Sequence, residues 1–346
     1  MIIDNEIKIK RQKEMDEHEL QIIMTLYGHK ESNSKFLNTK EYKELVNEFI
    51  NSNIPVNYNF NLKPLTTSQI RRKANKIIRE ETKGIDLRVP YYPGDSRLIY
   101  NYIAETGDND LEDGYALAHY MKSKMRLINV TKLPIRWDID EERSGNFNVL
   151  HYEIEDEEFL KNCPVVTNGF VMTNENDILS SAHLVHEMTH ALTDRNKGII
   201  ENILNDEVLT IYMELVAASK LDKNNRLLDI AIRDRIESLK AAVLESLSYN
   251  HAGYPEGESL SYLISSLSSF PLFERYINSS EKEKAYLRGE INKTLMGNRT
   301  LEDTLKYLDI TKDEGSHIIK KEIKRRKKWF KKVMIINQNY ILFQLR

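Results

Sequence analysis

Residues 180–192 read SSAHLVHEMTHAL and contain the pattern His-Glu-x-x-His at positions 186 to 190. Apolar residues recur every three or four positions in this segment, which predicts a helix. On a helix, His186 and His190 lie four residues apart on one face, so their imidazoles can converge on a single ion. Neutral imidazole suits zinc, and two such ligands leave room for a third protein ligand and a water molecule.

Glu187 follows the first histidine directly and would lie beside the metal, close to the position of that water. A carboxylate there can accept a proton from the water and then pass it to a leaving amine. We therefore interpret Glu187 as a general base for hydrolysis. The alternative is a pair of core histidines with an incidental acid between them.

A third ligand is expected from the next helix, which the pattern predicts around residues 204–215. This segment carries Glu207 and Glu214, which are two helical turns apart and share a face. Both cannot bind one ion unless the helix is strongly distorted. The sequence therefore predicts one glutamate as the ligand and the other as a supporting residue.

The motif and its following glutamate helix resemble the gluzincin superfamily of zinc metallopeptidases. The segment from Glu207 to Glu214, with Tyr212 between them, is similar to the glutamate helix of leucyl-aminopeptidase-like gluzincins. It also resembles the glutamate spacing of the thimet oligopeptidase and oligoendopeptidase families. In both groups the first glutamate is the ligand, so the resemblance implies Glu207, with Glu214 as support. The gap of 17 residues after His190 is short for these families and leaves Glu214 open as the ligand.

Two other branches of zinc peptidases do not fit. Thermolysin-like enzymes carry Asp four residues after the ligand glutamate, where this chain has Ile211. Metzincins need Gly and His after the motif, where Thr193 and Asn196 stand.

Residues 249–262, YNHAGYPEGESLSY, resemble a glycine-rich loop of the thimet oligopeptidase family in which a histidine and spaced tyrosines reach over the zinc. The resemblance implies His251, Tyr254 and Tyr262 as donors to the substrate and to the oxyanion. A phenol O–H or an imidazole N–H aimed at the developing negative charge stabilises it. The alternative is a turn whose aromatic side chains pack on the core.

Prolines and glycines divide the chain into three stretches. The first is predicted to be helical, with helices at 42–50 and 69–81 and an N-cap among residues 66–68. The second has a helix at 112–125 and short β-rich runs at 133–137, 146–150, 164–166 and 169–172. The last two runs form either a strand pair or one bulged strand, and 169–172 is expected to be a sheet edge that aligns substrate backbone.

The third stretch reads as successive helices, interrupted by one loop-like region between Pro255 and Pro271. The predicted fold class is therefore α+β, mostly helical with a small mixed sheet. We expect a helical N-terminal region over residues 1–85. With the resemblance, residues 86–346 are expected to form a zincin-like catalytic domain, its sheet at about 86–172 and its helices at about 177–346.

Composition excludes several classes of protein. The chain has 346 residues, a net charge of −3 and a single cysteine, Cys163, so a disulfide scaffold and a four-cysteine zinc site are excluded. No membrane-spanning apolar run and no signal peptide are visible, so we expect a cytoplasmic protein and leave unconventional export open. The basic run at 320–332 is interpreted as a helix face whose Ile319, Ile323 and Phe330 pack inward.

Together these features predict a metallopeptidase with one zinc ion per chain, held by His186, His190 and Glu207. The expected partner is a peptide or protein substrate; neither a membrane nor nucleic acid is expected, and the oligomeric state is left open. The alternative is a catalytically silent or single-target regulatory protein on the same scaffold.

Overall fold

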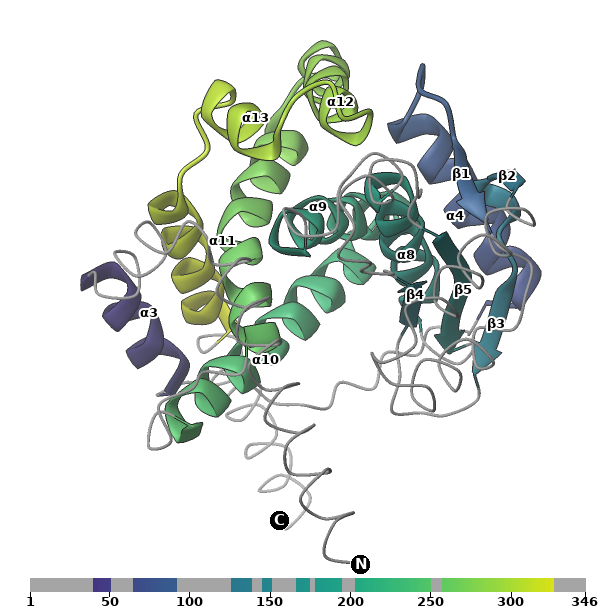
Figure 1. Ribbon diagram of the computed structural model, residues 1–346. Coiled ribbons are helices and arrows are strands. Elements are labelled where there is room, and N and C mark those ends of the chain that lie inside the picture. Colours follow the sequence, from purple (N-terminus) through teal and green to yellow (C-terminus); the bar gives the residue numbers. More distant parts are fainter. Residues whose placement is uncertain are drawn as a thin grey trace, which may run out of the picture.

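The computed structural model describes residues 40–50, 65–91, 126–138, 145–150, 166–174, 178–194, 203–249 and 257–326. Within these residues the protein is mostly helical, as the sequence predicts, and its strands form two small sheets where one was expected. Figure 1 shows α8 (Ser180–Asp194) and α9 (Ile203–Leu221) between two groups of elements. The strands and α4 (Thr67–Glu81) lie on one side, and α10 (Arg226–Tyr249) and α11 (Gly257–Asn278) lie on the other.

The two helices predicted in the N-terminal region are present. The first is α3 (Lys40–Ile50). The second is α4, which begins after Thr66 with a capping box: the Thr66 side chain accepts from the Gln69 backbone, and the Gln69 side chain accepts from the Thr66 backbone. One face of α4 is buried and packs against α8. The domain boundary near residue 85 stays a prediction.

In the part of the chain that the structure describes, five strands form the two sheets. Strand β1 (Arg88–Tyr91) pairs antiparallel with β2 (Arg126–Asn129), and neither was expected from the pattern. The second sheet has the order β3-β5-β4, with β3 (Ile135–Asp138) parallel to β5 (Val166–Asn174) and β4 (Gly145–Leu150) antiparallel to it. The pairing of β4 with β5 shifts register between Phe147 and Val149, which supports one bulged strand over a strand pair at 166–174.

The loop-like region expected between Pro255 and Pro271 is wrong from Gly257 onward, where α11 begins. Pro271 lies inside α11, which continues to Asn278. A proline has no N–H, so the carbonyl of Leu267, four residues earlier, loses its helical partner. Gly315 of the helical segment 312–326 packs directly on this carbonyl. The close approach of a second helix therefore covers the place where proline interrupts the hydrogen bonding of α11.

Replacing Gly315 with Ala is expected to lower the free energy of unfolding by about 1–3 kcal/mol, as overpacking typically does. An added Cβ would overlap the Leu267 carbonyl oxygen and lie 2.6 Å from its carbon, and backbone cannot move aside as a side chain can. Chemical denaturation measures the change. The matched control is Gly289→Ala in α12 (Glu281–Leu295), where a Cβ meets nothing within 4 Å. There alanine should stabilise by about 0.5–1 kcal/mol. Equal effects at the two sites would contradict this packing.

The basic segment near the C-terminus is docked by its charges as well as by its apolar face. Ile319 and Ile323 are fully buried, which confirms the predicted inward packing, whereas Phe330 lies outside the described residues. Lys320 pairs with Glu44 of α3 at 3.0 Å, and Arg325 pairs with Asp229 of α10 at 2.7 Å. The segment is thereby tied to both of these helices.

The buried apolar side chains of the described residues form one contiguous core that extends from α3 to the segment 312–326. Both α8 and α9 contribute many fully buried residues to it, so the two helices are held rigidly side by side. Among the described helices, none has the length and apolar character that crossing a membrane would require.

Candidate metal centre

The functional side chains predicted from the motif lie where α8 and α9 pack against each other. Helix α8 carries His186, Glu187 and His190, and α9 carries Glu207 and Glu214. Glu187 and Glu207 are each 7% exposed and Glu214 is 2% exposed. Acidic side chains are rarely buried this deeply unless they are paired or bind a cation. The burial of three carboxylates in one place therefore needs a chemical explanation.

Three donor groups converge at this place. The Nε2 atoms of His186 and His190 are 3.1 Å apart. The carboxylate of Glu207 faces both, with Oε2 at 3.7 Å from Nε2 of His186 and Oε1 at 3.5 Å from Nε2 of His190. Each of the three residues offers one ligand atom within 4.8 Å of the others, so the group could hold a metal ion. The helical spacing of the two histidines brings about this convergence, as the sequence predicts.

Glu214 lies on the other side of the first histidine. Its Oε2 is 2.9 Å from Nδ1 of His186, away from the converging Nε2 atoms. The same oxygen accepts a hydrogen bond of 2.6 Å from Nη2 of Arg235, which is on α10. Glu207 therefore faces the Nε2 atoms, whereas Glu214 contacts the back of the His186 ring.

Thr210 holds Glu207 from within its own helix. Its hydroxyl lies 3.2 Å from Oε2 and 3.1 Å from the backbone carbonyl of Glu207. Thr210 is fully buried and is one turn after Glu207, so it restrains the carboxylate on the side facing the histidines.

Burial and neighbouring charges shift the pKa values of this cluster in different directions. Burial raises the pKa of Glu187, and the nearby His186 and His190 oppose this only in part. Burial would also raise the pKa of Glu214, but Arg235 and the hydrogen bond with His186 outweigh it and hold that pKa well below the usual range. Burial lowers the pKa of Arg235, and Glu214 and Glu207 more than offset this. Glu214 is thus a fixed carboxylate, whereas Glu187 more readily takes up a proton.

The three residues predicted on the downstream loop are only partly covered. His251 and Tyr254 lie outside the described residues. Tyr262 is on α11, half-buried against the core. It lies near enough to Arg235 to be among the groups that raise the pKa of that guanidinium. Tyr262 is therefore on the side of the cluster formed by α10 and α11.

Sequence reasoning missed Arg235 and Thr210. Arg235 is 21 residues after Glu214 and on another helix, so no local spacing connects the two residues. Thr210 could have been found from the sequence, because it is three positions after the predicted ligand Glu207 and so lies on the same helix face.

The expectation that residues 169–172 form a free sheet edge is wrong for Val171 and Met172. Both pair with β3 on one side and with β4 on the other, because β5 is the central strand of its sheet. A strand paired on both sides has no row of backbone groups left for a substrate. Within the described part of this sheet the outer strand near α8 is β4, which contacts that helix.

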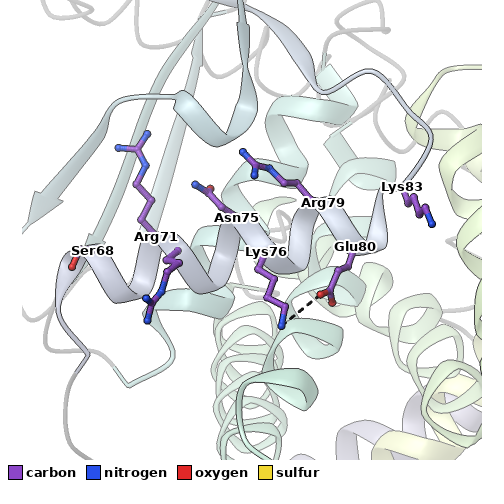
Figure 2. Close-up of a pocket in the computed structure, with 8 residues that line it drawn as sticks. Ser68, Arg71, Asn75, Lys76, Arg79, Glu80 and Lys83 are labelled. Atoms are coloured by element: carbon purple, nitrogen blue, oxygen red, sulfur yellow. Dashed lines mark ion pairs between the residues drawn. The ribbon is translucent and has the colours of Figure 1, made fainter.

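A separate open pocket with a volume of about 800 Å³ lies along α4, and none of the metal-centre residues line it. Figure 2 shows Arg71, Asn75 and Arg79 pointing to one side of this helix, where they donate hydrogen bonds to the backbone or side chains of residues 131–133. On the other side Lys76 pairs with Glu80 at 3.8 Å. These groups attach α4 to the chain segment before β3 and offer no nucleophile or base for hydrolysis.

Within the described residues, His186, His190 and Glu207 are therefore the group that could bind a metal ion. The geometry alone does not identify which metal this would be. The chain matches no protein-family model, no curated protein and no solved structure.

Proposed function

We propose that the protein is a zinc-dependent metallopeptidase that hydrolyses peptide bonds. In this proposal His186, His190 and Glu207 bind one zinc ion per chain, and Glu187 is the general base. The observation that carries it is the convergence of two Nε2 atoms and the Glu207 carboxylate, at separations of 3.1 to 3.7 Å, close to a second buried acid, Glu187.

The separations of the donor atoms fit a tetrahedral zinc ion. Ligand bonds of about 2.0–2.1 Å at tetrahedral angles put donor atoms roughly 3.3–3.4 Å apart. The two Nε2 atoms are 3.1 Å apart, and the nearest approaches of the Glu207 carboxylate, through Oε1 to His190 and Oε2 to His186, are 3.5 and 3.7 Å, all close to this value. Two imidazoles and one carboxylate are also a ligand set of catalytic zinc sites, which keep the fourth position open.

The charges of the cluster also favour a divalent cation. Glu187, Glu207 and Glu214 are three buried acids, and the guanidinium of Arg235 pairs with one of them, Glu214. With all three acids ionised and Arg235 positive, the cluster carries two net negative charges, which one divalent ion neutralises. Protons on both histidines are a poor substitute, because two Nε2–H groups facing each other at 3.1 Å would collide.

Glu187 suits the role of base by its position and its environment. It is next to His186 in sequence and buried, and burial raises its pKa above that of an ordinary glutamate. A base whose pKa approaches the working pH is the more effective proton carrier. In the proposed reaction a carboxylate oxygen of Glu187 takes a proton from the attacking water and then delivers it to the leaving amine. When bound, zinc would lower the pKa of that water and polarise the scissile carbonyl.

Tyr262 and the outer edge of β4 are the candidate contacts for substrate. A phenol O–H near the cluster can donate to the developing oxyanion, which supports the role predicted for Tyr262. His251 and Tyr254 keep the same predicted role. An extended peptide could add to β4 by backbone hydrogen bonds, since β4 is the outer strand of the described sheet and contacts α8.

A zincin-like core of the gluzincin type belongs to this proposal. Its support is local: a small mixed sheet precedes the helix with the motif, and the next helix supplies the glutamate. The proposed partner is a peptide or protein substrate. The alternative of a catalytically silent or single-target protein shares the metal centre and differs in its activity on generic peptides.

The test is zinc analysis of the purified protein together with cleavage of a peptide library. We expect one zinc ion per chain, cleavage that a chelator abolishes, and recovery when zinc is added back. Zinc binding without cleavage of any library peptide would favour the single-target or silent alternative. If the protein contains no zinc and takes none up, the proposal fails.

A further inference from the structure

Three helices contribute to a line of hydrogen bonds that ends at the proposed zinc site. Nη2 of Arg235 on α10 donates to Oε2 of Glu214 on α9 at 2.6 Å. The same oxygen is 2.9 Å from Nδ1 of His186 on α8. The side chain of Glu214 is 3% exposed and that of Arg235 is 14% exposed, so the line is shielded from water. Short, shielded hydrogen bonds between charged groups are the strong ones.

The chemistry of Arg235 fixes the direction of every bond in this line. A guanidinium has only donors, so Oε2 of Glu214 must be an acceptor. The same oxygen then accepts from His186 as well, which assigns the ring proton to Nδ1. The lone pair of His186 is thereby on Nε2, the atom that faces His190 and Glu207 at 3.1 and 3.7 Å. An imidazole binds a metal through the nitrogen that carries no proton.

We propose that Arg235 is a positioning residue of the zinc site, which orients the His186 ring and its tautomer through Glu214. This inference rests on the proposed zinc centre and extends it to a residue on a third helix. Arg235 does not bind the metal in this arrangement; it acts on the metal only through the carboxylate. Without Arg235, Glu214 loses the hydrogen-bond donor that orients its carboxylate oxygen toward His186.

Zinc affinity is the direct readout, measured by competition with a chelator of known affinity. Losing a partner behind a metal-bound histidine typically weakens metal binding by about 10–100-fold. We expect Arg235→Met to weaken zinc binding by about tenfold or more. Arg235→Lys returns a cationic donor to the position and should bind zinc more tightly than Arg235→Met does. Should Arg235→Met fail to fold, Arg235→Gln replaces it in the same comparison.

Arg299→Met is the matched control. Arg299 forms a hydrogen bond of 2.5 Å with the buried Glu290, far from the metal centre in sequence and on other elements. The variant loses a comparable arginine–carboxylate contact, so its thermal stability should fall. Its zinc affinity should equal that of the wild type. A loss of zinc affinity in both variants would mean that general destabilisation is the cause, and would overturn the proposal.

A double variant tests whether Arg235 acts through Glu214. If it does, Arg235→Met combined with Glu214→Gln should bind zinc no more weakly than Glu214→Gln alone. If the losses of zinc affinity in the two single variants add up in the double variant, Arg235 does not act through Glu214 and the proposal fails. If the wild type binds zinc and Arg235→Met binds it equally well, only this inference fails. If the wild type takes up no zinc, the proposed function fails first.

Discussion

Glu187→Gln is expected to lower the rate of peptide hydrolysis by about 10²–10⁴-fold while leaving one zinc ion bound per chain. General base catalysis typically contributes a factor of this size. Glutamine has nearly the shape of glutamate but cannot accept a proton at neutral pH. The three donor atoms proposed to bind zinc are on other residues, so the metal should stay.

Glu237→Gln is the control for this experiment. Burial raises the pKa of Glu237 as it does that of Glu187, but Glu237 is on α10 and pairs with Arg233. The same chemical change there should leave both hydrolysis and zinc content unchanged. Full activity of the Glu187→Gln protein would rule out Glu187 as the base.

His190→Ala is expected to remove stoichiometric zinc binding and, with it, the stabilisation that zinc gives to the folded protein. A ligand that binds only the folded state stabilises it by about 2.7 kcal/mol at a hundredfold excess over Kd. The wild type should therefore melt at a higher temperature with zinc than with a chelator. His190→Ala should melt at the same temperature under both conditions.

His317→Ala serves as the control, because His317 is exposed on the segment 312–326 and is not among the three converging donors. This variant should retain one zinc ion and the zinc-dependent rise in melting temperature. Persistent stoichiometric zinc binding by His190→Ala would mean that the ion is held elsewhere.

The part of the site that sequence predicted correctly depends on local geometry. Two histidines four residues apart on a helix must face the same way, and the structure brings their Nε2 atoms to 3.1 Å. The helix with Glu207 and Glu214 was likewise predicted from its periodicity. The sequence left open which glutamate faces the Nε2 atoms, because that depends on how α8 and α9 are offset along their contact.

The features that sequence reasoning missed depend on contacts between distant segments. Arg235 reaches Glu214 from a third helix, and no motif connects the two. The central position of β5 follows from pairing with two strands that precede it in the chain. Pro271 was expected at a loop because proline usually ends a helix, but it lies inside α11, where Gly315, 44 residues later, packs on the carbonyl that proline leaves without a helical partner.

The most direct test of the central claim is X-ray absorption spectroscopy of the zinc-loaded protein. We expect one zinc ion per chain with nitrogen and oxygen ligands at about 2.0–2.1 Å, two of them imidazoles. In Glu207→Gln the zinc coordination should change, whereas in Glu214→Gln both imidazoles should remain. A zinc ion with fewer than two imidazole ligands, or a wild-type protein that binds no zinc, would rule out the proposed site of His186, His190 and Glu207.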